Sequence, residues 1–388
     1  MSNIEPKIEV YDVESVTTQA YGSAGKIALI GAFPSATFKL DVFTRLDDAK
    51  ESVKGEYRLP NDNSVDNASL DPVPSDFGAF YCLDYIFNSN NQSGGAESVL
   101  IVNTNYGKET LTYTSTNQDI ANACVLLAEE DFDILTIAEP IALAVSSALN
   151  PICATLKSFV DSQFLAQKPF GIITGFDLTG ASTVLDDFKD LFGDKGIYKA
   201  ITTPVRLNGD AEALTIAQSG CWHSAFTSGR PVNKSETAKV YQGVIGENSK
   251  DLYPVGATIT YKNLLDNGFH TTRYRNRRLG TIECLSNITP VGYDMKIERV
   301  KNYIIRRLAL RDVLGEDNNN ITRDFVKGLF EYEKQLAIQS NYLVDMDYQI
   351  KSIDAETIQA ELKLYIADIV RVIKLNVELN IATYEGAE

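Results

Sequence analysis

The stretch GFHTTRYRNRRLG, from Gly268 to Gly280, differs from the rest of the chain because four of its thirteen residues are arginines. Between residues 261 and 311, Lys and Arg number 11 and Asp and Glu number 4, a local charge of +7 (11 − 4). The whole chain carries −16, so the remaining residues carry −23. A basic block within an acidic chain indicates a surface that meets a negative partner, although most charge runs are simply solvated faces.

A helix is predicted to follow this block, from about Asp294. Its apolar residues recur at the spacing of one helical face: Ile297, Val300, Ile304 and Leu308. Four cations are placed on the opposite side of this helix: Lys296, Arg299, Arg306 and Arg307. A second amphipathic helix is predicted over residues 322–339, with one apolar face made of Phe325, Leu329, Tyr332 and Leu336.

Composition sets the broad class of the protein. A chain of 388 residues with 44% hydrophobic and 23% charged residues is long enough for two or three domains with proper cores. Its acidic balance argues against general nucleic-acid binding. No apolar run is long enough to span a bilayer, and the first residues lack the pattern of a secretory signal. We therefore expect a protein made in a cytoplasm, with no direct membrane insertion.

Catalytic, metal and cofactor sites are not predicted. The five cysteines are widely spaced, and none forms a C-x-x-C pair. One of the two histidines lies in the run Trp222-His223-Ser224, where helical neighbours point about 100° apart and cannot act as nucleophile and base. The acidic run Glu129-Glu130-Asp131 is interpreted as a solvated face.

Residues 99–226 alternate short apolar strands with helices, which is typical of an α/β domain with a mostly parallel sheet. Before this region, a strand containing Ile8 and Val10 precedes a small, polar link over residues 14–25 and an apolar strand starting at Lys26. Towards the end, hydrophobic residues alternate with polar ones, first at Ala360, Leu362, Leu364 and Ile366, then at Leu375, Val377, Leu379 and Ile381. Both ends of the chain therefore read as extended arms.

This order of elements resembles the contractile tail sheath family of phages and related injection systems. The resemblance lies in an apolar strand ending in glycine (Ile27 to Gly31), a β-segment after an Asn-Gly pair (Asn267 to Thr289), a helix with a basic start (Lys296, Arg299) and a terminal strand (Leu375 to Ile381). It implies an α/β (α+β) layered body with extended arms. The implied parts are an N-terminal arm and linker (1–25), an outer α/β domain (26–226), an inner sheath domain (227–366) and a C-terminal arm strand (367–388).

The resemblance also implies a function in assembly. A sheath subunit polymerises helically around an inner tube and contracts to drive the tube through a target envelope. Its partners are other copies of itself, the inner tail tube protein, and baseplate and tail terminator proteins. It is located in a virion tail or injection particle assembled in the host bacterial cytoplasm. Tube contact is then expected from Lys296, Arg299, Arg306 and Arg307, and strand exchange between subunits from Ile8, Val10, Leu375, Val377, Leu379 and Ile381.

Two other classes stay open from the sequence. An α/β enzyme of the hydrolase kind needs a nucleophile on a strand-to-helix turn, but no G-x-S-x-G motif occurs. Another viral structural protein, a tube or shell subunit, is the second alternative. Wide hollow tubules in electron micrographs indicate a sheath, narrow tubes or closed shells indicate the second alternative, and single particles indicate an enzyme.

Overall fold

Short apolar runs form the strands at the centre of the computed structural model, which describes residues 25–54, 73–87, 95–143, 151–179, 196–290, 292–308, 320–352 and 358–367. Within these ranges, seven strands form one sheet in the order β2-β3-β1-β4-β6-β5, and β7 also pairs with β6. The strands are β1 (Lys26–Gly31), β2 (Leu40–Phe43), β3 (Ser98–Asn103), β4 (Ile134–Ile137), β5 (Ile141–Ala142), β6 (Gly171–Asp177) and β7 (Ile197–Ile201). Only β2 runs antiparallel to its neighbour.

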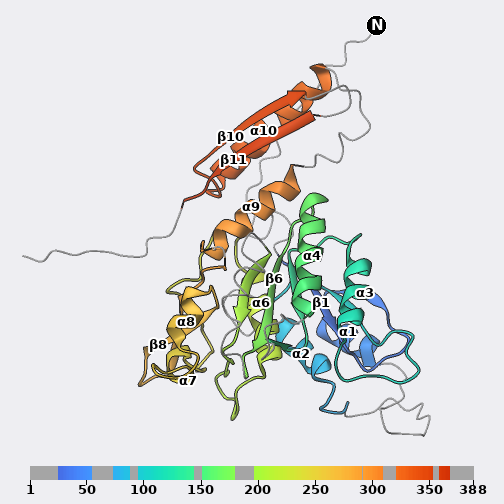
Figure 1. Cartoon of the computed structure of the whole chain (residues 1–388), viewed down its shortest axis with the longest axis vertical. Coiled ribbons are helices and arrows are strands. Elements are labelled where there is room, and N and C mark those ends of the chain that lie inside the picture. Colours follow the sequence, from blue (N-terminus) through green and yellow to red (C-terminus); the bar gives the residue numbers. More distant parts are fainter. Residues whose placement is uncertain are drawn as a thin grey trace, which may run out of the picture.

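Helices cover both faces of this sheet (Figure 1). Alternate residues of β1 enter two different cores: Ala28 and Ile30 pack with α3 (Asn117–Leu127) and α4 (Pro151–Leu165). Ile27 and Leu29 pack on the other side, in the core with α1 (Leu46–Lys54), α2 (Gly78–Phe87) and α6 (Ile216–Ser228). A strand buried on both faces has to be apolar throughout, which is why these strands are short continuous apolar runs. The α/β prediction for this region is confirmed.

Helix α6 lies unusually close to the sheet because glycines meet at the contact. A Cβ atom added at Gly220 of α6 would come within 2.8 Å of the backbone nitrogen of Gly175 in β6. A Cβ added at Gly175 would come within 2.5 Å of the Ile216 carbonyl oxygen. The helix is also fixed at its start, where Thr215 and Gln218 form a capping box.

The outer face of α6 packs on the chain that follows it. Trp222 and Phe226 share a core with Tyr241, Ile282 and Cys284. This layer contains the short helices α7 (Ser249–Leu252) and α8 (Tyr261–Asp266) and the antiparallel hairpin β8 (Thr271–Asn276) and β9 (Thr281–Ser286). The domain border predicted near residue 226 stays a prediction, and α6 shares one core with the residues that follow it.

A smaller unit is built from α10 (Asn320–Gln339), β10 (Asp345–Ser352) and β11 (Ile358–Tyr365), at the upper end of Figure 1. The predicted alternation in β11 is confirmed, because Leu362, Leu364 and Ile366 pack on the core of this unit. The predicted apolar face of α10 is wrong. Its buried residues are Thr322, Val326, Phe330, Glu333 and Ala337.

On the predicted face of α10, Phe325 (54%) and Tyr332 (59%) are exposed, and Leu329 and Leu336 are half-buried. The reason is that α10 carries two apolar stripes, and the buried one includes an acid, Glu333, which is neutralised by Arg307. A sequence pattern that ranks stripes by hydrophobicity therefore selects the wrong one.

Helix α9 (Met295–Arg307) connects the body with the smaller unit (Figure 1). Met295, at its start, belongs to the core beneath α2 and α6. Val300, Tyr303 and Ile304 belong to the core of α10 and β10. The Asn302 side chain also joins α9 to the body: its amide donates to the Tyr198 hydroxyl at 2.8 Å and to the Phe170 carbonyl at 3.3 Å.

We predict that Gly220→Ala destabilises the protein by roughly 2 kcal/mol or more, because the new methyl group meets fixed backbone. Gly328→Ala is the matched control, since Gly328 also lies inside a helix but nothing lies within 4 Å of its added Cβ. That substitution should stabilise by roughly 0.5–1 kcal/mol. Urea unfolding of both variants measures the difference, and equal effects would contradict the close approach of α6.

Candidate functional surfaces

Three of the four cations expected to contact a tube are engaged within the chain. Arg299 is 4% exposed, and its Nη2 donates to the Arg230 carbonyl at 3.1 Å. Arg306 donates from Nη1 to the Phe132 carbonyl at 2.6 Å and pairs with Asp133. Burial lowers the pKa of the Arg306 guanidinium to about 10.

Arg307 binds the Glu333 carboxylate through Nε at 2.8 Å and Nη2 at 3.0 Å, a bidentate pair. The expectation that Arg299, Arg306 and Arg307 lie on an open helix face is therefore wrong. The single apolar stripe of α9 predicts that only one face of the helix is buried. In the structure, both the body and the α10 unit cover the helix. Lys296 is half-buried at the start of the helix. Tube contact itself stays a prediction.

The arginines of the β8–β9 hairpin face solvent. At the tip of the β8–β9 hairpin, Arg275, Arg277 and Arg278 are exposed. Arg277 pairs with Asp251 at 3.0 Å, an ion pair whose two side chains are 71% and 49% exposed, so it is worth little. The basic residues therefore fall into two groups: those on α9, which are mostly engaged within the chain, and those on the hairpin, which are exposed.

Strands β10 and β11 form a sheet of their own, paired in register from Asp345 with Tyr365 to Ser352 with Ile358. Among the described ranges, no further strand pairs with either of them. The residues predicted to exchange strands lie outside the described residues: Ile8, Val10, Leu375, Val377, Leu379 and Ile381. Among the described residues, the outer edges of both strands are therefore unpaired, and each offers backbone groups to which an extended segment can bond.

The crevice at the carboxyl ends of the parallel strands is filled by side chains. In open α/β sheets ligands bind where connections from adjacent strands leave to opposite faces. Here that place is the end of β1, and Glu139 fills it by accepting from the Ala32 and Ser115 backbone nitrogens at 2.9 and 2.6 Å. Asn105 is fully buried, and its side-chain amide donates hydrogen bonds to the carbonyl oxygens of Phe33 and Thr112. Burial raises the pKa of the Glu139 carboxyl.

The two histidines lie within a buried polar cluster between α6, β7 and β9. Lys199 Nζ donates to Glu236 Oε2 at 2.5 Å and to Thr227 Oγ1 at 2.8 Å. The Tyr241 hydroxyl donates to Glu236 at 3.2 Å and contacts His270 Nε2 at 3.1 Å. The rings of His223 and His270 are 4.6 Å apart. The cluster is enclosed by protein, and Trp222, His223 and Ser224 are all buried.

Burial and the Lys199–Glu236 attraction together determine the protonation of this cluster. Burial lowers the pKa of Lys199, an effect that the Glu236 carboxylate opposes. It favours the neutral form of Glu236, but Lys199 outweighs it and holds the carboxyl pKa below its usual value. The pair is therefore ionised. Burial also lowers the pKa of His270 to about 3 and that of His223 well below its usual value, so both imidazoles are neutral.

Among the residues that the structure describes, no group of three or more His, Cys, Asp or Glu side chains is placed to hold a metal ion. All five cysteines are buried and free. None of the described helices has both the length and the apolar character needed to cross a membrane.

The neutral histidines predict a loss of stability in mild acid. In the unfolded chain each titrates near pH 6.5, so lowering the pH from 7 to 5 protonates the unfolded state but not the folded one. Each histidine should then cost roughly 2 kcal/mol of unfolding free energy over that interval. Urea unfolding at pH 7, 6 and 5 should show a shallower dependence in the variant His223→Gln with His270→Gln. Equal slopes in variant and wild type would contradict the assigned protonation.

Comparison with known proteins bears on the fold. No protein-family model matches the sequence, and no curated protein sequence matches it either. Solved structures do match. The sheath tail protein of Desulfitobacterium hafniense superposes with a TM-score of 0.55 at 12% identity, covering 93% of this chain and 100% of that one.

Two further structures agree with this match. The sheath tail protein of Listeria innocua has a TM-score of 0.55 at 13% identity, covering 89% of this chain and 96% of that one. A chain of the anti-feeding prophage baseplate in its contracted state has a TM-score of 0.52 at 14% identity, covering 98% and 99%. The described architecture, from the α/β body to the small β10–β11 sheet, is therefore the fold of the sheath tail proteins.

Proposed function

We propose that this protein is the subunit of a contractile tail sheath, which polymerises helically around an inner tube and shortens to drive that tube through a target envelope. The observation that carries the proposal is the match of nearly the whole chain to nearly the whole length of sheath tail proteins. A match over one domain would support only a shared module. Baseplate, terminator and tube proteins are the partners that this function requires, in a particle assembled in the bacterial cytoplasm.

The small β10–β11 sheet gives the proposal its physical basis. A two-stranded sheet is marginal by itself and gains stability from added strands. The alternating sequences around Ile8 and Val10 and from Leu375 to Ile381 have the period of such strands. Donated to a neighbouring copy, they would add main-chain hydrogen bonds in register and join subunits without a large buried interface. The small, polar residues 14–25 would let the bodies move while the strands remain paired.

The exposed stripe of α10 supports an interface on the same unit. Ile321 is 81%, Phe325 54% and Tyr332 59% exposed, on a helix whose other face is already buried. Such apolar surface is typical of a contact with another protein. We propose that the α10 unit, with Lys296 at the start of α9, is the part that approaches the tube.

Proline substitutions test strand exchange. Val377→Pro with Leu379→Pro should abolish wide tubules in electron micrographs, because proline removes the N–H donors that a donated strand needs. The melting temperature of the monomer should not change. Gly386→Pro, outside the alternating segment, is the control and should assemble normally. Normal tubules from the double variant would contradict strand exchange at this terminus.

Lys296 is the position at which tube contact can be tested without breaking internal pairs. We expect Lys296→Glu to weaken co-sedimentation with preformed inner tubes by a few-fold, with a stronger effect at low salt. Lys262→Glu makes the same charge change at an exposed site on α8 and should leave co-sedimentation unchanged. If both variants sediment with tubes like the wild type, Lys296 does not take part in tube contact.

A further inference from the structure

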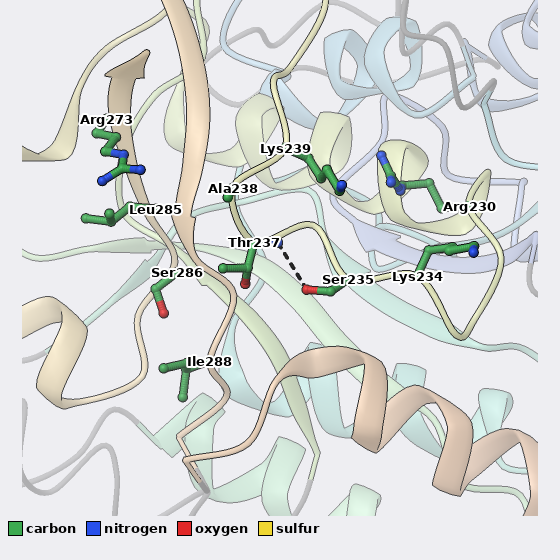
Figure 2. Close-up of a pocket in the computed structure, with 10 residues that line it drawn as sticks. All are labelled: Arg230, Lys234, Ser235, Thr237, Ala238, Lys239, Arg273, Leu285, Ser286 and Ile288. Atoms are coloured by element: carbon green, nitrogen blue, oxygen red, sulfur yellow. Dashed lines mark hydrogen bonds between the residues drawn. The ribbon is translucent and has the colours of Figure 1, made fainter. Parts of the chain in front are cut away.

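A cation-lined pocket of about 570 Å³ opens between residues 230–239 and the β8–β9 hairpin (Figure 2). Its rim carries four positive side chains: Arg230, Lys234, Lys239 and Arg273. Small and apolar residues lie between them, including Ala238, Leu285 and Ile288. A pocket of this size accommodates a short peptide segment.

The pocket is preformed by hydrogen bonds. The Ala238 amide donates to the Cys284 carbonyl at 2.8 Å, and the Cys284 amide donates to the Lys239 carbonyl at 3.0 Å. On the other side, the hydroxyls of Ser235 and Thr237 donate to Asp294 at 2.6 and 3.0 Å. Asp294 is also the N-cap of α9, so this segment is fixed to the start of that helix. A partner would therefore bind without first ordering these residues.

The positive charge of the pocket is only partly balanced within the chain. Glu283 pairs with Arg273 at 2.6 Å, and Asp294 is fully buried beneath the hydroxyls. No acidic side chain is among the described residues that line the pocket, and Lys234 and Lys239 are exposed at its rim. Arg230 is half-buried against the Phe226 ring, so the outward positive charge comes mainly from Lys234, Lys239 and Arg273. The pocket is therefore suited to carboxylates.

A matching acidic turn lies at the opposite end of α9. Glu129, Glu130 and Asp131 follow α3, and Glu129 and Asp131 are exposed. Arg306, in the last turn of α9, bonds the next residue, Phe132. Since α9 has 13 residues, the pocket and the acidic turn are separated by the length of a helix that spans about 20 Å.

We propose that the pocket receives the acidic turn 129–131 of a second copy of this chain, an inference that rests on the proposed sheath function. Pocket and turn lie at two ends of one helix, so a contact between them is head-to-tail and repeats from copy to copy. Contacts of this kind build open helical arrays. Strands exchanged between neighbours would hold the turn at high effective concentration, so a modest electrostatic attraction suffices.

Charge reversal on each side tests the contact. Lys234→Glu with Lys239→Glu should raise the critical concentration for tubule formation by about tenfold or more, and so should Glu129→Lys with Asp131→Lys. The four substitutions combined should restore assembly to within about threefold of the wild type, because both sides of a head-to-tail contact occur on every copy. Lys234 and Lys239 are exposed, so that pair should melt like the wild type, whereas Asp131 attracts the Arg306 guanidinium and its reversal should lower the melting temperature of the acidic pair.

Lys39→Glu with Lys262→Glu is the control for the lysine pair, with the same change in net charge (−4) at exposed lysines outside the pocket. It should assemble normally. Normal assembly of either reversed pair, or no recovery in the combined variant, overturns the contact while tubules of the wild type still support a sheath. If the wild type forms no tubules, the sheath proposal itself fails and the contact with it.

Cross-linking of the wild type gives an independent readout. Tubules grown from a mixture of ¹⁴N and ¹⁵N protein and treated with a zero-length amine–carboxyl cross-linker should yield isotopically mixed links from Lys234 or Lys239 to residues 129–131. Links from these lysines only to another protein segment, or only within one copy, would overturn the proposal.

Discussion

Helix α9 must satisfy two cores at once, and much of the structure depends on that constraint. Its first turn is buried with the helices of the body, and its later turns are buried with α10 and β10. A helix enclosed on two sides has little open surface left for its polar residues. Asn302, Arg306 and Arg307 therefore bind partners on the units that α9 joins. Removing one partner would leave a buried charge unpaired, so the junction is fixed by electrostatics as well as by packing.

Much of the fold could be predicted because the strands of the body are buried on both faces and read as short apolar runs. The same reasoning misses elements whose burial is decided elsewhere in the chain. Strand β10 was not predicted, although Met346, Tyr348 and Ile350 alternate with polar residues. On α10, the more hydrophobic stripe stays only partly buried, whereas the stripe that includes Glu333, paired with Arg307, is buried.

The candidate surfaces were less predictable than the fold, for a related reason. The sequence showed a basic block, but not which of its cations have partners far along the chain. Arg306 meets Phe132, which is 174 positions away, and Arg299 meets Arg230. The cation-lined pocket combines two segments, 230–239 and 273–288, of which only the second is conspicuously basic. Its composition becomes visible only once the hairpin has folded back on residues 238–241.

The edges of the β10–β11 sheet, which no described strand pairs, have a consequence for selectivity. An unpaired strand edge can bond to any extended peptide, and a newly synthesised subunit encounters many such peptides before it encounters another copy of the chain. The solvent side of this sheet is charged: Lys351 pairs diagonally with Glu361, and the Tyr365 hydroxyl donates to Asp347. A foreign strand with apolar side chains on that side would remove these charged groups from water without offering new hydrogen-bond partners, which costs free energy. The edges of the sheet can bond to the backbone of any extended segment. The charged face favours segments whose side chains match it, which limits aggregation with unrelated peptides.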